Sequence, residues 1–184
     1  MKPGFSTRYL DELFRLECAP ALLRMKLFPD SKELTESMAM YEAVRSLKHF
    51  EREGKESDGI VCVGDGSTPR TAAMFAFRTK GWQCYCVDPQ AREDNKDWQD
   101  IERLQILPNK IETVRIRLRR AVVVLMHAHV SLASTMQSIL AEEVVGVVCC
   151  PCCNWLPRQA SLYGQKPSKV YEDPAIISPH REVR

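Results

Sequence analysis

A short apolar run that leads directly into a glycine-rich turn constrains the fold of this chain more than any other feature. Residues 60–63 are all apolar or cysteine, as expected of a strand that is buried on both faces. Gly64, Asp65 and Gly66 follow as a turn. Pro69 suits the first position of a helix, because its missing N–H would have no partner there. This succession of strand, turn and helix predicts a parallel sheet covered by helices.

Strand and helix patterns then alternate as far as residue 149. We expect further strands at residues 82–87, 111–118, 121–126 and 144–149. Helical composition follows the first turn and recurs at residues 94–104 and 131–143. The last thirty residues contain four prolines, so we expect a loop-rich tail with at most one further edge strand, at residues 175–177. The predicted class is α/β, as a three-layer Rossmann-like fold with a mainly parallel sheet.

The chain of 184 residues has the length of one domain with a full hydrophobic core. Residues 1–57 read as an N-terminal helical extension, in which Asp30 and Glu33 resemble a helix-capping pair. Residues 58–184 would form the Rossmann-like domain. The extension is expected to cover part of the core, and it is equally suited to shape a substrate entrance or a partner surface.

The composition excludes several classes of protein. No run of 18 apolar residues is present, so we expect no membrane-spanning helix. The N-terminus lacks the apolar stretch of a secretory signal, and four of the eight cysteines crowd between residues 149 and 153, too close together to join distant loops. We therefore expect a reduced, intracellular and cytoplasmic protein. The net charge of +2 points to no particular partner.

Polar and reactive residues gather where the expected strands end. Gly64, Asp88, His127 and Cys149 each begin such a segment, and parallel sheets bind ligands beyond the carboxyl ends of their strands. A carboxylate at the tip of the second strand, as Asp88 would be, can accept hydrogen bonds from the two hydroxyls of a ribose. The alternative is a glycine turn with an aspartate that only caps the next loop.

Between about residues 58 and 156 the chain resembles the class I S-adenosylmethionine-dependent methyltransferases. The resemblance rests on Val63-Gly64-Asp65-Gly66, Val87-Asp88-Pro89, His127-Ala128-His129 and the stretch 149–155. It is closer to a branch with a His-Ala-Cys-Gly motif, in which His129 would replace the cysteine and Val130 the glycine. The chain departs from the family at Cys62, where an acid is frequent, and at residues 67–69, where a third glycine is common.

This resemblance implies S-adenosylmethionine as the cofactor. Gly64 and Gly66 would line its methionine end and Asp88 would hold its ribose. We assign Asp65, Pro89 and His127 to the same cofactor site.

The histidines and cysteines at the ends of the last two strands leave three alternatives. They could bind zinc, although residues 149–153 are a tight segment for two ligand pairs. His129 or a thiol of low pKa could serve as a base beside the transferred methyl group, in which case His129, Cys150 and Cys152 are the catalytic candidates. Otherwise the cysteines fill a crowded strand end, which is the reading we favour, with no metal bound.

The predicted function is methyl transfer from S-adenosylmethionine to an unidentified acceptor, RNA or protein. A catalytically inactive methyltransferase-like subunit, used for binding or assembly in a larger complex, is the alternative. A nicotinamide-dependent enzyme is a third option, weakened because a dinucleotide site needs glycine where Thr68 or Pro69 stands. Arg115, Arg117 and Arg119 would share one face of a strand and could contact RNA phosphates, or form a solvated edge.

Overall fold

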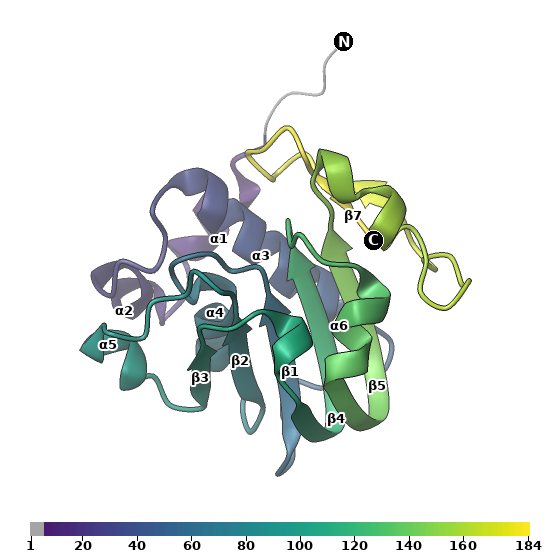
Figure 1. Cartoon of the computed structure of the whole chain (residues 1–184). Helices are drawn as coiled ribbons and strands as arrows, with labels where there is room; N and C mark the ends of the chain where they lie inside the picture. The colour runs from purple at the N-terminus through teal and green to yellow at the C-terminus, as the bar shows by residue number, and fades with distance from the viewer. Residues whose placement is uncertain (1–5) are drawn as a thin grey trace.

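The computed structural model describes residues 6–184 (Figure 1). Its helices are α1 (Arg8–Leu13), α2 (Ala19–Arg24), α3 (Ser31–Arg45), α4 (Arg70–Arg78), α5 (Lys96–Gln99) and α6 (Leu132–Ser138). Its strands are β1 (Asp58–Val63), β2 (Gln83–Val87), β3 (Leu104–Leu107), β4 (Ile116–Met126), β5 (Ile139–Cys150), β6 (Tyr171–Glu172) and β7 (Glu182–Val183). Short 3₁₀ turns occur at η1 (Ile111–Thr113), η2 (Cys153–Trp155) and η3 (Pro157–Gln159).

A parallel sheet in the order β3-β2-β1-β4-β5 forms the centre of the molecule. The register aligns the carboxyl ends of its inner strands, because Val63 of β1 pairs with both Val87 of β2 and Leu125 of β4. Leu125 in turn pairs with Cys149 of β5. The segments that leave these strands therefore begin along one edge of the sheet.

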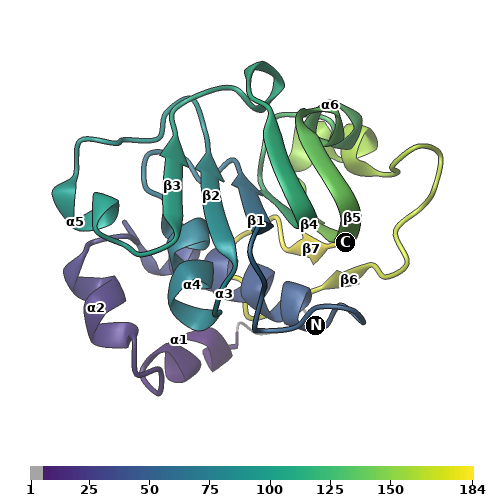
Figure 2. The same ribbon diagram turned by 90° about the horizontal axis from the view of Figure 1, so that it is seen from below.

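Helices cover both faces of this sheet (Figures 1 and 2). Alternate side chains of β1 show why: Ile60 and Cys62 pack into a core with α3 and α4, whereas Val61 and Val63 pack into a second core with α6. A strand with apolar residues on both faces must be covered on both sides. The predicted α/β class with a parallel sheet between helices is confirmed.

The helices that precede β1 pack against the same core as the sheet. Asp30 accepts a hydrogen bond from the backbone N–H of Glu33 (2.8 Å) and so caps α3, as the sequence predicted. The Oγ of Ser37 on α3 lies 3.0 Å from Oγ1 of Thr71 on α4, in a buried position. The apolar residues of α3 belong to one continuous core with those of α4 and of the sheet.

The third and fourth strands differ from the prediction. β3 is the short segment Leu104–Leu107, of which only Leu104 lay in the expected helix at residues 94–104, and Ile111–Thr113, where a strand was expected, is a 3₁₀ turn. The strand expected at residues 121–126 begins earlier, at Ile116. Two of its arginines are paired with acids: the guanidinium of Arg119 binds the carboxylate of Asp58, which is fully buried, and that of Arg120 lies 3.4 Å from Glu143. A pairing between residues 61 positions apart left no local pattern in the sequence.

β5 and the tail also differ from the prediction. β5 begins at Ile139, inside the segment expected to be helical, since α6 ends at Ser138. Residues 175–177 form no strand; instead β6 and β7 pair in antiparallel fashion on either side of them. The backbone of Arg184 exchanges two hydrogen bonds with Cys149 (2.9 and 3.0 Å), which attaches the tail to β5. Between residues 6 and 184 no helix combines the length and the hydropathy needed to cross a bilayer.

Candidate functional site at the carboxyl ends of the strands

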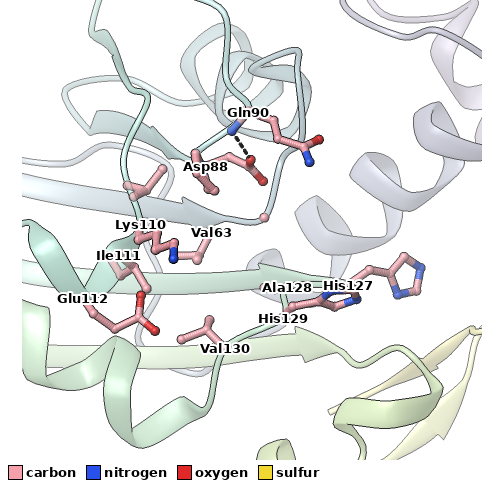
Figure 3. A pocket seen from close by; sticks show the side chains of 13 residues that line it. Val63, Asp88, Gln90, Lys110, Ile111, Glu112, His127, Ala128, His129 and Val130 are labelled. Carbon is pink, nitrogen blue, oxygen red and sulfur yellow. Dashed lines mark hydrogen bonds between the residues drawn. The ribbon is translucent and has the colours of Figure 1, made fainter.

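A cavity of about 460 Å³ opens at the edge where β1, β2 and β4 end (Figure 3). Its walls come from the ends of three strands and from the segment around η1. The lining includes Gly64, Asp88, Pro89, Lys110, His127 and His129. Small-molecule sites in proteins commonly have volumes of about 300–1,000 Å³, and the position is the one expected for a ligand of a parallel sheet.

Gly64 and Asp88 form one corner of the cavity. Gly64 has a φ of +86°, and a Cβ there would lie 2.8 Å from the Cα of Ala128, so only glycine fits this turn. The carboxylate of Asp88 accepts hydrogen bonds from the backbone N–H groups of Gly66 (2.9 Å) and Gln90 (2.7 Å; Figure 3). Asp88 therefore ties the turn after β1 to the turn after β2.

The Asp65 side chain turns away from the cavity and caps α4. It is 1% exposed and accepts hydrogen bonds from the backbone N–H groups of Thr71 and Ala72, at 3.0–3.2 Å. Burial raises the pKa of the Asp65 carboxyl, against the opposing effects of Arg70 and of these hydrogen bonds. The Asp65 side chain thus caps the helix and is not among the side chains that line the cavity; its contact with a cofactor stays a prediction.

His127 joins the cavity to α3. Its φ is +51°, an uncommon conformation for a residue other than glycine, and its backbone N–H donates to the carbonyl of Cys150 (2.9 Å). Its Nε2 lies 3.1 Å from Oε1 of Glu36, whose side chain is completely buried. His127 therefore holds the end of β4 against both β5 and the N-terminal helices.

Glu36 belongs to a buried charged network around the N-terminal turns of α3 and α4. Lys32 lies 3.4 Å from its Oε1, and Arg70 lies 4.0 Å from its Oε2 and 3.8 Å from Glu33. The longer separations leave Oε2 of Glu36 and Nε of Arg70 without a hydrogen-bond partner. Lys32 and Arg70 supply the positive charge beside Glu33 and Glu36, and Arg70 also acts on the buried carboxyl of Asp65.

His129 lies on the other side of the cavity from Asp88 (Figure 3). It is exposed, and its ring stacks on that of Trp155, with centroids 5.8 Å apart and planes 11° from parallel. Of the three predicted catalytic residues, it is the one that lines this cavity among the described residues.

The thiols at the end of β5 are poor candidates for catalysis. Cys150 is fully buried, and its Sγ lies 3.4 Å from the carbonyl oxygen of His180. Burial raises the pKa of the Cys150 thiol strongly and that of Cys149 to about 11, so both are protonated at neutral pH. Cys152 is partly exposed. Among the side chains that the structure describes, no three His, Cys, Asp or Glu groups are arranged to hold a metal ion; the Cys153 side chain lies outside that description.

The predicted RNA-binding arginines lie near the opposite end of β4. Arg117 and His127 are ten residues apart, which corresponds to about 33 Å along an extended strand. Arg115 donates to the backbone carbonyls of Glu112 and Val114, and Arg119 binds Asp58. Arg117 is exposed. Arg117 and Arg119 are therefore remote from the cavity, whereas Arg115 bonds to the backbone of Glu112, which lines it.

Several residues of the site carried no sequence signal. Lys110 and Glu112 line the cavity from the segment after β3, where the sequence predicted a strand. Gln159, fully buried, donates from Nε2 to the carbonyls of Ala128 (2.8 Å) and Val130 (2.9 Å) and so fixes the loop that carries His129. A lone glutamine in a loop-rich tail has no pattern that could have revealed this role.

Comparison with known proteins adds no assignment. No protein-family model matches the chain, and neither a curated protein nor a solved structure is significantly similar to it.

Proposed function

We propose that this chain is an S-adenosylmethionine-dependent methyltransferase of the class I, Rossmann-like type. The observation that carries the proposal is the position of Asp88 at the tip of β2, in the wall of the cavity and hydrogen-bonded to the turn at residues 64–66. An acid at this point of a parallel sheet is suited to hold the ribose of a nucleoside. The strand order β3-β2-β1-β4-β5 places that point beside the first strand.

The hydrogen-bonding capacity of Asp88 fits a ribose. An ionised carboxylate offers about four acceptor positions, and backbone N–H groups use one on each oxygen. One acceptor position per oxygen remains, which matches the two vicinal hydroxyls. The backbone bonds hold the carboxylate in place before a ligand arrives, so little ordering would be needed on binding.

Asp65 favours a sulfonium nucleoside over a dinucleotide. A dinucleotide site binds pyrophosphate through the free N–H groups at the start of the helix after the first strand. In this chain the Asp65 carboxylate already accepts from Thr71 and Ala72 in the first turn of α4. A buried acid would also repel phosphate. S-adenosylmethionine has no phosphate, so neither feature opposes it.

Bound S-adenosylmethionine would supply an electrophilic methyl group. The part of the protein would be to align the acceptor with that group and to accept a proton when the acceptor must lose one. His129 is an exposed residue of the cavity wall whose ring nitrogen can take such a proton. Cys150 is removed from this role, because its buried thiol has a raised pKa and bonds to a backbone carbonyl.

The burial of the thiols also supports a second candidate, a binding module of the same fold without catalysis. The His129 ring stacks on Trp155, and among residues 6–184 it forms no ion pair with a carboxylate that would orient it as a base. Transfer of a labelled methyl group to cell extract distinguishes the two candidates, provided that S-adenosylmethionine is bound in both cases.

Calorimetry with S-adenosylmethionine, S-adenosylhomocysteine and NAD tests the proposal directly. We expect the first two to bind and NAD not to. Asp88→Ala should weaken S-adenosylmethionine binding by about 1–3 kcal/mol, which is about 5- to 150-fold, through lost charge-assisted hydrogen bonds. Asp94→Ala is the matched control, because Asp94 is an exposed acid whose ion pair is with Arg92. Binding of NAD alone, or an Asp88→Ala affinity equal to that of the control, would disprove the proposal.

A further inference from the structure

Three planar groups form a column at the mouth of the cavity. The His129 ring stacks on Trp155, and the guanidinium carbon of Arg158 lies 4.9 Å from the centre of the Trp155 ring. His129 and Arg158 are exposed, and Trp155 is partly so. Because His129 also lines the cavity, the column ends at the cavity mouth in an exposed imidazole on which a further planar group can stack.

The column stands on a fixed base. The Nε2 of Gln159 donates to the backbone carbonyls on both sides of His129. The backbone carbonyl of Gln159 accepts a hydrogen bond from the guanidinium of Arg184 (2.9 Å). Arg184 also donates to the carbonyl of Leu156 (3.0 Å). The segment that carries Trp155 and Arg158 is thereby attached to the loop that carries His129. A stacking surface of this kind needs little ordering when it receives a ligand.

The segment that follows the column is basic and contains exposed aromatic and apolar residues. From Val144 to Tyr171 the chain contains no Asp or Glu, whereas Arg158 and Lys166 are exposed. Lys169 is also exposed, but its Nζ lies 4.8 Å from the centre of the Tyr171 ring, in a separate hollow that Glu42, Glu172 and Asp173 also line. Tyr163, 71% exposed, lies in the same loop, which projects beyond β5 in yellow-green in Figure 1. The other exposed charges at the cavity, Lys110 and Glu112, offset each other.

We infer that this surface binds single-stranded nucleic acid, with one base stacked on His129 at the mouth of the cavity. Aromatic faces accept any base, and a row of cations follows the phosphates, which is how strands without pairing are held. Arg158 and Lys166 supply the cations. A duplex would not present a free base face to His129. That the stacked base is also the methyl acceptor rests on the proposed function; binding of the strand does not.

Intrinsic fluorescence offers a direct readout of the stacking. Trp82 and Trp98 are 0% and 4% exposed. A nucleic acid bound at His129 should therefore change the fluorescence of Trp155, the ring on which His129 stacks. We expect a short oligouridylate to quench this emission without any cofactor, and the same length of duplex to have much less effect. Two phosphate contacts predict a slope of about −1.4 for the logarithm of affinity against the logarithm of salt concentration. Absence of binding at low salt would overturn the inference.

Variants separate this surface from the arginine row on β4. His129→Ala should weaken binding of fluorescein-labelled oligouridylate by about 5- to 150-fold, as loss of one base–aromatic stack does. A double change of Arg158 and Lys166 to glutamine should bring the salt slope close to zero. Both changes lie at exposed positions, so folding should be kept, and a thermal melt checks it.

Arg117→Ala is the matched control, since Arg117 is an exposed arginine at the far end of β4. Loss of binding in Arg117→Ala, or affinity unchanged in both other variants, would refute the inference. If oligouridylate binds but S-adenosylmethionine does not, the proposed function is refuted and the inferred nucleic-acid surface is not. If S-adenosylmethionine binds but oligouridylate does not, only the inferred nucleic-acid surface is refuted.

Discussion

Gly64→Ala measures how tightly the turn after β1 is packed against the loop after β4. The backbone at Gly64 has a φ of +86°, and the added Cβ would lie 2.8 Å from the Cα and the Cβ of Ala128. The left-handed conformation costs about 1–2 kcal/mol for an L-residue, and overpacking adds about 1–3 kcal/mol. Alanine also lowers the conformational entropy of the unfolded chain, which stabilises the folded state by about 0.4–1 kcal/mol. We therefore expect the free energy of unfolding to fall by about 2–4 kcal/mol.

Gly164→Ala is the control that separates the backbone conformation from the contact. Gly164 has a φ of +80°, but a Cβ there would have nothing within 4 Å. Its cost should be the conformational part alone, about 1 kcal/mol. Urea unfolding, followed by circular dichroism with equal m-values for both variants, provides the comparison. If the two losses agree within about 0.5 kcal/mol, the close packing of the turn against Ala128 is refuted.

Two further predictions follow from buried groups beside the cavity. Asp65→Ala should lower the free energy of unfolding by about 2–4 kcal/mol, because two buried N–H groups of α4 lose their acceptor; a urea midpoint unchanged from wild type would contradict the capping role. Burial raises the pKa of Cys149 to about 11, so about 0.1% of its thiol is ionised at pH 8, and iodoacetamide should label the half-exposed Cys152 long before Cys149, as peptide mass spectrometry can measure. The folded state keeps the Cys149 proton that the unfolded thiol releases, so this group should reduce stability as the pH rises from about 9 to about 11; faster labelling of Cys149 at pH 8 would disprove its burial.

The N-terminal helices contribute to the cavity as well as to the core. Glu36 of α3 reaches His127, and Arg70 of α4 lies between Glu33 and Glu36. Removing one member of such a buried network leaves an uncompensated charge, which is more costly than removing an exposed one. A ligand in the cavity would therefore lie against a wall whose position depends on α3.

Local patterns in the sequence were sufficient to predict the first turn and its surroundings. The run at residues 60–63, the glycine at residue 64 and the helix after Pro69 are encoded within a few residues of one another, and the structure has β1, a left-handed Gly64 and α4 there. The position of Asp88 at the tip of β2 follows from the same kind of pattern. Each of these features depends on backbone conformation and on the spacing of apolar residues, which are properties of the neighbouring sequence.

Tertiary structure decided which side chains face the cavity. Asp65 lies between two glycines of the predicted turn, but its carboxylate accepts hydrogen bonds from backbone N–H groups of α4. Cys150 stands at a strand end, yet the tail covers it. Gln159 forms hydrogen bonds to the loop after β4 across 29–31 residues of sequence. Glu36 bonds to His127 in the same loop across 91 residues. A hydrogen bond between such distant residues depends on how the elements pack, and packing leaves no periodic trace in the amino-acid sequence of either partner.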